Sequence, residues 1–135
     1  MTPNEFQQAM KTYLDDNGYP AVLVETDYTA QDWSKERDRT IAENHMTIII
    51  SWSAGRPKRR SHMITSVWDI ICIINERHSA DLSPAVALPV FDKLLNNPEW
   101  NYASVDMASN IERDISDNNY IVYAGGLEAT LGMDC

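Results

Sequence analysis

Hydrophobic positions near the start of the chain recur at the spacing of a helix. Thr2, Pro3 and Glu5 supply the N-cap, the first-turn proline and the capping-box acid of a helix start. An apolar stripe follows at i, i+3, i+4, i+7 and i+8, made of Phe6, Ala9, Met10, Tyr13 and Leu14. The turn residues of 17–20 (NGYP) end the stripe. The pattern predicts a helix over residues 4–16 whose striped face packs against a core.

Alternation replaces the helical spacing after this helix. Residues 21–27 (AVLVETD) predict a short first strand. Residues 45–54 (HMTIIISWSA) alternate between two faces, which is typical of a half-buried strand. One face carries Met46, Ile48, Ile50 and Trp52, and the other carries Thr47, Ile49, Ser51 and Ser53. Residues 55–61 (GRPKRRS) contain glycine and proline and predict a hairpin tip.

The most apolar stretch, residues 66–75 (SVWDIICIIN), fits either a helix or a strand. The positions with helical spacing are Val67, Ile70, Ile71 and Ile74. The positions that alternate as in a strand are Trp68, Ile70, Cys72 and Ile74. Five of the ten residues are β-branched, no helix-start signal stands close before them, and a predicted strand lies just upstream. We therefore expect a strand that forms a long central hairpin with residues 45–54.

A strand over residues 66–75 would be apolar on both faces, because Val67, Ile71 and Ile73 lie opposite the face of Trp68. Both faces then require cover. Two helices can cover one face, so unless they split, the second face or the sheet edge requires another subunit. Isoleucines left in water would each forfeit about 1.5–3 kcal/mol. Self-assembly follows as a hypothesis.

The remaining segments predict a second helix, a second hairpin and a long loop. Ser83-Pro84 begins a helical stripe that residues 96–98 (NNP) end, and Pro89 within it predicts a kink or a later start. The stripe consists of Ala87, Val90, Phe91, Leu94 and Leu95. Residues 104–111 and 120–131 form the hairpin arms around a turn at 117–119, with a bulge at Gly125-Gly126. The polar residues 28–44 are expected to form a surface loop or arm.

These elements indicate one α+β domain over residues 1–135. Their order is α-β-β-β-α-β-β, with two helices and a largely antiparallel sheet of about five strands. No apolar run approaches the roughly 20 residues that span a bilayer, and residues 1–11 lack the features of a secretion signal. We expect a cytoplasmic protein, or one assembled there into a larger particle. Cys72 is expected to be an inert core thiol, and Cys135 makes no disulfide framework with it.

Candidates for chemistry are few. The histidines, His45, His62 and His78, lack metal-ligand spacing. No phosphate-binding glycine loop follows a strand, and no serine stands in a nucleophile elbow. Glu25 and Asp27 form a carboxylate pair of the kind that chance produces among 20 acids. We therefore expect no enzyme activity, no cofactor and no metal site.

Charge is unevenly distributed along the chain. The net charge is −9, yet residues 45–67 contain no acid and include Arg56, Lys58, Arg59 and Arg60. A basic hairpin tip on an acidic body favours head-to-tail association. Three interpretations of the tip stay open: a solvated tip, contact with an acidic face of a neighbouring subunit, and non-specific contact with nucleic acid. Trp33, in the polar segment, either tucks against the domain or anchors a partner.

The order of the elements resembles the tail terminator and neck-type (head-tail joining) proteins of tailed bacteriophages. These are small α+β proteins with an N-terminal helix, a central β-hairpin with an extended loop, a second helix and a closing pair of strands. The resemblance spans nearly the whole chain, from residues 4–16 to residues 120–131. It rests on HMTIIISWSAG, SVWDIICIIN, SPAVALPVFDKLLNNPEW and NNYIVYAGGLEATL. It lies in order and length, because the family has no strict residue motif.

The resemblance implies a structural virion protein with no enzyme activity and no cofactor. Its copies would form a hexameric ring that caps the tail tube, stops its polymerisation and meets the neck or connector proteins, away from any membrane. The tip at 56–60 would face the tube, a ring neighbour or the lumen, where it could contact DNA. Residues 28–44 would be a docking arm. The alternative function is a small acidic module that binds or inhibits a host protein.

Overall fold

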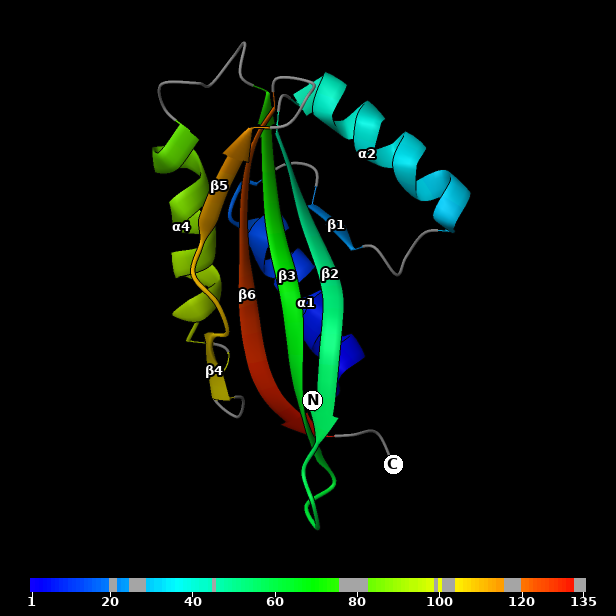
Figure 1. Cartoon of the computed structure of the whole chain (residues 1–135), viewed down its shortest axis with the longest axis vertical. Helices are drawn as coiled ribbons and strands as arrows, with labels where there is room; N and C mark the ends of the chain where they lie inside the picture. Colours follow the sequence, from blue (N-terminus) through cyan, green and yellow to red (C-terminus); the bar gives the residue numbers. More distant parts are fainter. Residues whose placement is uncertain are drawn as a thin grey trace.

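A mixed sheet with strands along the long axis of the molecule forms the centre of the fold (Figure 1). The computed structural model describes residues 1–19, 22–24, 29–44, 46–75, 83–98, 100, 104–115 and 120–132. The helices are α1 (Pro3–Asp16), α2 (Ala30–Asn44) and α4 (Ser83–Leu95). The strands are β1 (Val22–Val24), β2 (Met46–Pro57), β3 (Met63–Asn75), β4 (Ser104–Met107), β5 (Glu112–Ile115) and β6 (Tyr120–Gly132).

The strands lie in the order β1-β2-β3-β6-β4, and β5 also pairs with β6. Only the β1–β2 pair is parallel among the described strands. Strand β3 pairs with β2 from Ile74 to Ile64 and with β6 from Asn75 to Met63. The strand predicted at 66–75, the long central hairpin and the α+β class are therefore confirmed. The described residues contain one helix and one strand more than expected.

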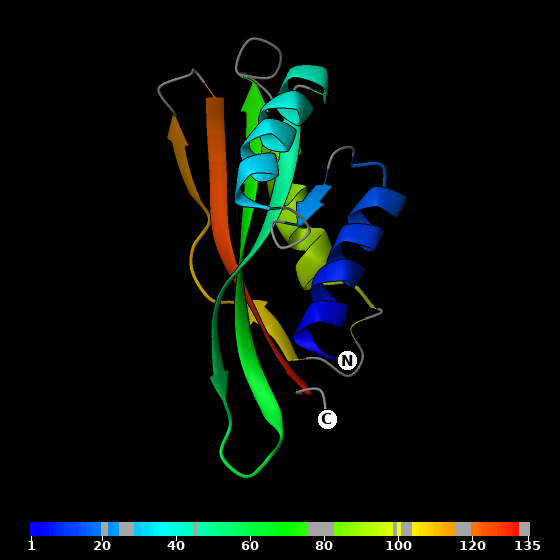
Figure 2. The ribbon, with the colours of Figure 1, turned by 90° about the vertical axis from the view of Figure 1, so that its right-hand side faces the viewer.

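Helices α1 and α4 cover one face of the sheet, which we call the first face (Figures 1 and 2). The predicted stripes supply its buried side chains: Phe6, Met10 and Leu14 from α1, and Ala87, Val90, Phe91 and Leu94 from α4. Helix α1 begins as expected, since the Thr2 hydroxyl accepts a hydrogen bond from the Glu5 amide (3.2 Å). Helix α4 runs from Ser83 to Leu95 as one helix, with Pro89 inside it.

Aromatic rings fill the centre of this core. The Phe6 ring lies 5.1 Å from that of Trp68 and 4.8 Å from that of Trp100, measured between centroids. Both indoles have a partner for their N–H group: Trp68 donates to Oε1 of the buried Gln7 (3.3 Å), and Trp100 donates to the Leu94 carbonyl (2.6 Å). These bonds let large amphipathic rings be buried without leaving a polar group unsatisfied.

The prediction of a loop over residues 28–44 is wrong, because α2 occupies residues 30–44. Thr29 begins the helix, its hydroxyl accepting a hydrogen bond from the Asp32 amide (3.3 Å). Among the α2 side chains that the structure describes, Thr40 and Ile41 are buried. The helix lies over the β1–β2 end of the opposite face, which we call the second face (Figures 1 and 2). Because the apolar stripe is this small and charged residues surround it, the sequence shows no clear helical periodicity.

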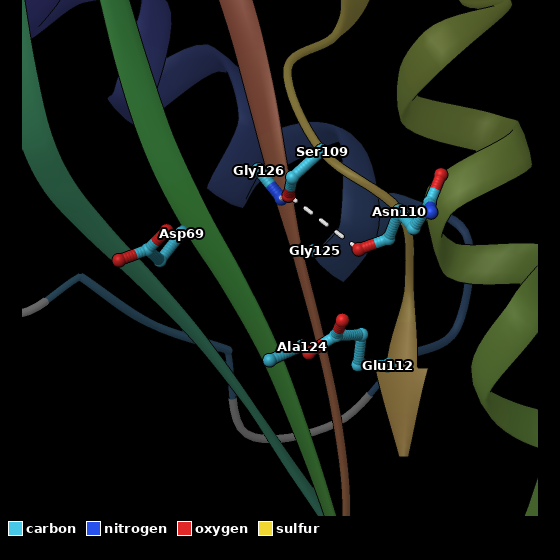
Figure 3. A pocket seen from close by; sticks show the side chains of 7 residues that line it. All are labelled: Asp69, Ser109, Asn110, Glu112, Ala124, Gly125 and Gly126. Carbon is cyan, nitrogen blue, oxygen red and sulfur yellow. Dashed lines mark hydrogen bonds between the residues drawn. The ribbon is translucent and has the colours of Figure 1, made fainter.

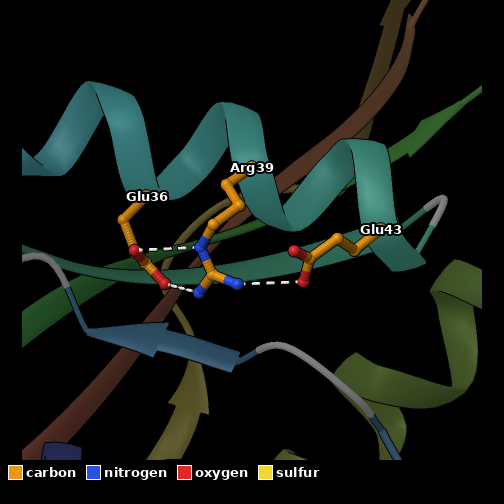
Figure 4. A network of polar contacts seen from close by, with 3 residues as sticks. All are labelled: Glu36, Arg39 and Glu43. Atoms are coloured by element: carbon orange, nitrogen blue, oxygen red, sulfur yellow. Dashed lines mark hydrogen bonds and ion pairs between the residues drawn. The ribbon is translucent and has the colours of Figure 1, made fainter.

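Ion pairs on the exposed side of α2 support the helix (Figure 4). The Arg39 guanidinium donates to both carboxylate oxygens of Glu36 and to Glu43 (2.9 Å), at spacings of three and four residues. The hydrogen bonds from Arg39 lower the pKa of Glu36 below its usual value. A segment rich in charges and poor in apolar residues can thus still be helical.

The C-terminal hairpin also differs from the prediction. The first arm is two short strands, β4 and β5, which pair with different halves of β6. The prediction of a bulge in the strand at Gly125-Gly126 is wrong, since the β3–β6 register is unbroken there. A Cβ at Gly125 would lie 3.0 Å from the Phe91 ring and 3.2 Å from Ile111, so close packing accounts for this glycine. A register shift occurs instead between Trp52 and Ala54 in β2. The predicted turn at 117–119 lies outside the described residues.

Substitution of two facing tryptophans tests which side chains belong to the core. Trp68 and Trp52 stand opposite each other in the β2–β3 register but are 0% and 45% exposed. Trp68→Ala should lower the free energy of unfolding by about 3–5 kcal/mol, because it leaves a cavity beside Phe6. Trp52→Ala should lower it by less than about 1 kcal/mol. Urea unfolding measures both values, and equal losses would contradict this description of the core.

Candidate functional site

The predicted basic tip lies at the end of the β2–β3 hairpin, at the bottom of Figure 1. Residues 52–62 are all exposed. The tip is closed by hydrogen bonds from the Lys58 amide to the Met63 carbonyl (2.9 Å) and from the Ser61 hydroxyl to the Lys58 carbonyl (3.3 Å). Arg60 and His62 have φ of 65° and 47°, a region that side chains other than glycine rarely adopt. The tip is therefore a defined turn that presents its side chains to solvent.

The tip cations have no acidic partner among the described residues. The ion pairs found there lie within α1 (Lys11–Asp15) and within α2 (Arg37–Asp38, Arg39–Glu36 and Arg39–Glu43). Arg56 shares a hollow of about 270 Å³ with Glu128, but the two form no ion pair. Lys58, Arg59 and Arg60, beyond the last strand pair, form a cationic end on an acidic protein.

The second face of the sheet is open outside the area of α2. Its exposed carboxylates are Asp69 on β3, Asp106 on β4, and Glu112 and Asp114 on β5. Between them lie aliphatic side chains that are only half-buried: Val67, Ile71, Ile73, Val122 and Ala124. By register these residues share one face, because Asp69 pairs with Gly126, and Glu112 and Ile71 both pair with Ala124. We call this surface, over β3, β6 and β5, the open face.

A hollow of about 230 Å³ lies in the middle of the open face (Figure 3). Asp69 and Glu112 line it from opposite sides of β6, and Ala124, Gly125 and Gly126 form its floor. Ser109 and Asn110 also line it, with the Ser109 hydroxyl accepting a hydrogen bond from the Gly126 amide (2.8 Å). Among the residues that the structure describes, neither carboxylate takes part in an ion pair. The hollow thus has one carboxylate on each side of β6 that a cationic group could meet.

The other sequence candidates are not brought to these surfaces. Trp33 is half-buried on α2, a helix that lies toward the opposite end of the long axis from the tip. His62 is exposed on the tip. Glu25, Asp27, His45, His78 and Cys135 fall outside the described residues. Within the described ranges, no three His, Cys, Asp or Glu side chains are grouped closely enough to hold a metal ion.

Trp52 is a surface residue that the alternation pattern assigned to the core. It stands 45% exposed at the root of the projecting hairpin, where its ring lies so near Gly55 that a Cβ there would be 2.7 Å from Cζ2. The register shift after Trp52 and the end of helical cover explain its exposure. The sequence signal for the exposure of Trp52 was that the turn residues Gly55 and Pro57 follow it closely.

Comparison with known proteins adds no family to this description. No protein-family model matches the sequence, and no curated protein matches it. None of the helices within the described ranges is long and apolar enough to cross a membrane. The interpretation of function therefore rests on the geometry of the tip and the open face.

Cys72 is buried in the core, as the sequence predicted. Burial raises its pKa to about 12, from an ordinary value of 9.0, so almost no thiolate forms near neutral pH. In a Cys135→Ser variant, we expect no reaction with a thiol reagent at pH 8 until denaturant is added. Rapid labelling of the folded variant would contradict this burial. The same shift contributes stability below about pH 9, which is lost as the pH rises toward 12.

Proposed function

We propose that this protein is a structural subunit that assembles head to tail into a ring. The observation that carries the proposal is the separation of two oppositely charged surfaces within one chain. The tip carries Lys58, Arg59 and Arg60 at one end of the long axis, and the open face carries Asp69 and Glu112, which form no ion pair among the described residues. Two different surfaces that complement each other make a heterologous contact, which closes into a ring when the rotation between copies allows.

The free edge of β2 supports a role in assembly. Strand β1 pairs only with Ile48–Ile50, so the edge of β2 beyond Ser51 has no strand beside it within the described residues. An unpaired edge invites pairing with other chains, and the register shift after Trp52 and the cationic tip limit uncontrolled pairing. The hairpin is thus suited to a specific contact with a neighbour.

The ring we propose resembles that of tail terminator and neck proteins of tailed bacteriophages. The element order supports the resemblance: an N-terminal helix, a long hairpin with an extended tip, a helix at 83–95 and closing strands. In that role the ring would cap the tail tube and meet the neck proteins in the virion. The helical segment α2 departs from the docking arm that the resemblance implied, since it packs on the protein's own sheet.

Electron microscopy with native mass measurement tests the ring. We expect closed rings of the purified protein, with the ring population falling as ionic strength rises because exposed charges are screened. Arg59→Glu should raise the concentration needed for assembly by about tenfold or more, because it places repulsion at the contact. The matched control is Lys35→Glu, which makes the same charge change at an exposed site on α2.

Two outcomes would count against the ring. A stable monomer at high micromolar concentration and low salt would refute it and would favour the alternative function of an acidic module that binds another protein. Equal effects of Arg59→Glu and Lys35→Glu would show that assembly responds to net charge and would remove the tip from the contact.

A further inference from the structure

We propose that the open face is the receptor for the hairpin tip of a second copy, with one tip cation paired to Asp69 and another to Glu112. This inference rests on the proposed ring and deepens it by naming the two surfaces that meet. It commits to a second copy as the occupant because the charges of the tip and of the open face are complementary within one chain.

The tip cannot reach this hollow in its own chain. Met63, the first strand residue after the tip, lies six positions from Asp69 along β3, a separation of about 20 Å at about 3.3 Å per residue. Glu112 is farther still, because it pairs with Ala124 opposite Ile71. Strand β3 continues without a break between the two places, and the tip extends beyond the end of the sheet (Figure 1). A tip cation that enters the hollow must therefore come from another molecule.

The hollow suits the chemistry of a tip side chain. Its two carboxylates lie on opposite sides of β6 and can each accept charge-assisted hydrogen bonds from a guanidinium or an ammonium group. The carbonyl group of Asn110, which the Ser109 hydroxyl approaches at 3.4 Å, provides a further acceptor on the same rim. The floor is glycine and alanine, so large side chains of the floor do not fill the site.

The surroundings of the hollow suit the rest of an arginine or lysine side chain. Ile71, Ala124 and Val122 are half-buried beside it, and the methylene stem of a long cation can cover such surface while its head pairs with carboxylates. Exposed ion pairs alone contribute little to binding, so this apolar contact matters to the stability of the joint. A polyanion such as DNA matches the tip but not the open face, whose carboxylates would repel it.

A charge-swap experiment tests the receptor. Asp69→Lys with Glu112→Lys, and separately Arg59→Glu with Arg60→Glu, should each weaken assembly by at least tenfold in the concentration required. All four substitutions in one chain should restore rings, because the reversed tip then meets a reversed receptor. The control is Asp16→Lys with Asp92→Lys, which changes the same charge on exposed sites of α1 and α4. Circular dichroism checks that every variant keeps its fold.

Zero-length crosslinking locates the contact independently. A carbodiimide joins Lys58 to a carboxylate only when the two touch, and mixing copies labelled with ¹⁴N and ¹⁵N separates links between copies from links within one. We expect mixed-isotope links from Lys58 to Asp69 or Glu112 in assembled wild-type protein.

The outcomes distinguish a failure of the proposed receptor from a failure of the proposed ring. Three results would overturn the receptor but not the ring. They are rings that persist in both double variants, a fourfold variant that stays dissociated, and crosslinks from Lys58 to other carboxylates. A wild-type protein that never assembles would overturn both. Rescue by the fourfold variant together with the mixed-isotope link would establish the receptor.

Discussion

The structure depends on strand β3, which is paired with β2 and with β6 along almost its whole length and carries apolar side chains on both faces. Such a strand is stable only when both of its faces have cover. Helices α1 and α4 provide the cover on the first face, and α2 provides it on the second face near β1 and β2. Because α2 reaches only that end, the part of the second face over β3, β6 and β5 keeps half-buried aliphatic side chains beside exposed carboxylates.

The same strand pairing puts the basic tip where it is. The β2–β3 ladder continues to Pro57 and Ile64, past the residues that the helices bury, and so carries the turn away from the acidic body. The turn holds Arg60 and His62 at positive φ, which costs about 1–2 kcal/mol for each residue that is not glycine. Glycine at either position would relieve that cost but would remove a side chain from the tip. A strained conformation at an exposed cationic turn agrees with a role in contact.

The sequence predicted the elements whose signals are local and strong. The capping residues and stripe of α1, the stripe of α4, and the β-branched run of β3 all gave the observed structure. Helix α2 was missed because few of its described side chains are buried, Thr40 and Ile41 among them, and charged pairs such as Arg39 with Glu43 occupy its exposed side. The hollow at Asp69 and Glu112 could not be predicted, because strand order rather than spacing brings β3 and β5 to either side of β6. Gly125 likewise serves a tertiary contact with Phe91 that no local pattern encodes.

The cover that α2 provides also changes what kind of contact the protein can make with a copy of itself. With Ile49 buried at 4% exposure and Thr47 at 0%, the part of the second face beside α2 is already covered within one chain. The remaining aliphatic residues are half-buried, so covering them fully would add only part of the roughly 1.5–3 kcal/mol that a whole side chain yields. An obligate, mainly hydrophobic interface is therefore not required for the fold. A joint built on this face must gain its specificity from charge, with apolar burial as the smaller share, and such a joint can form late and reversibly between subunits that fold alone.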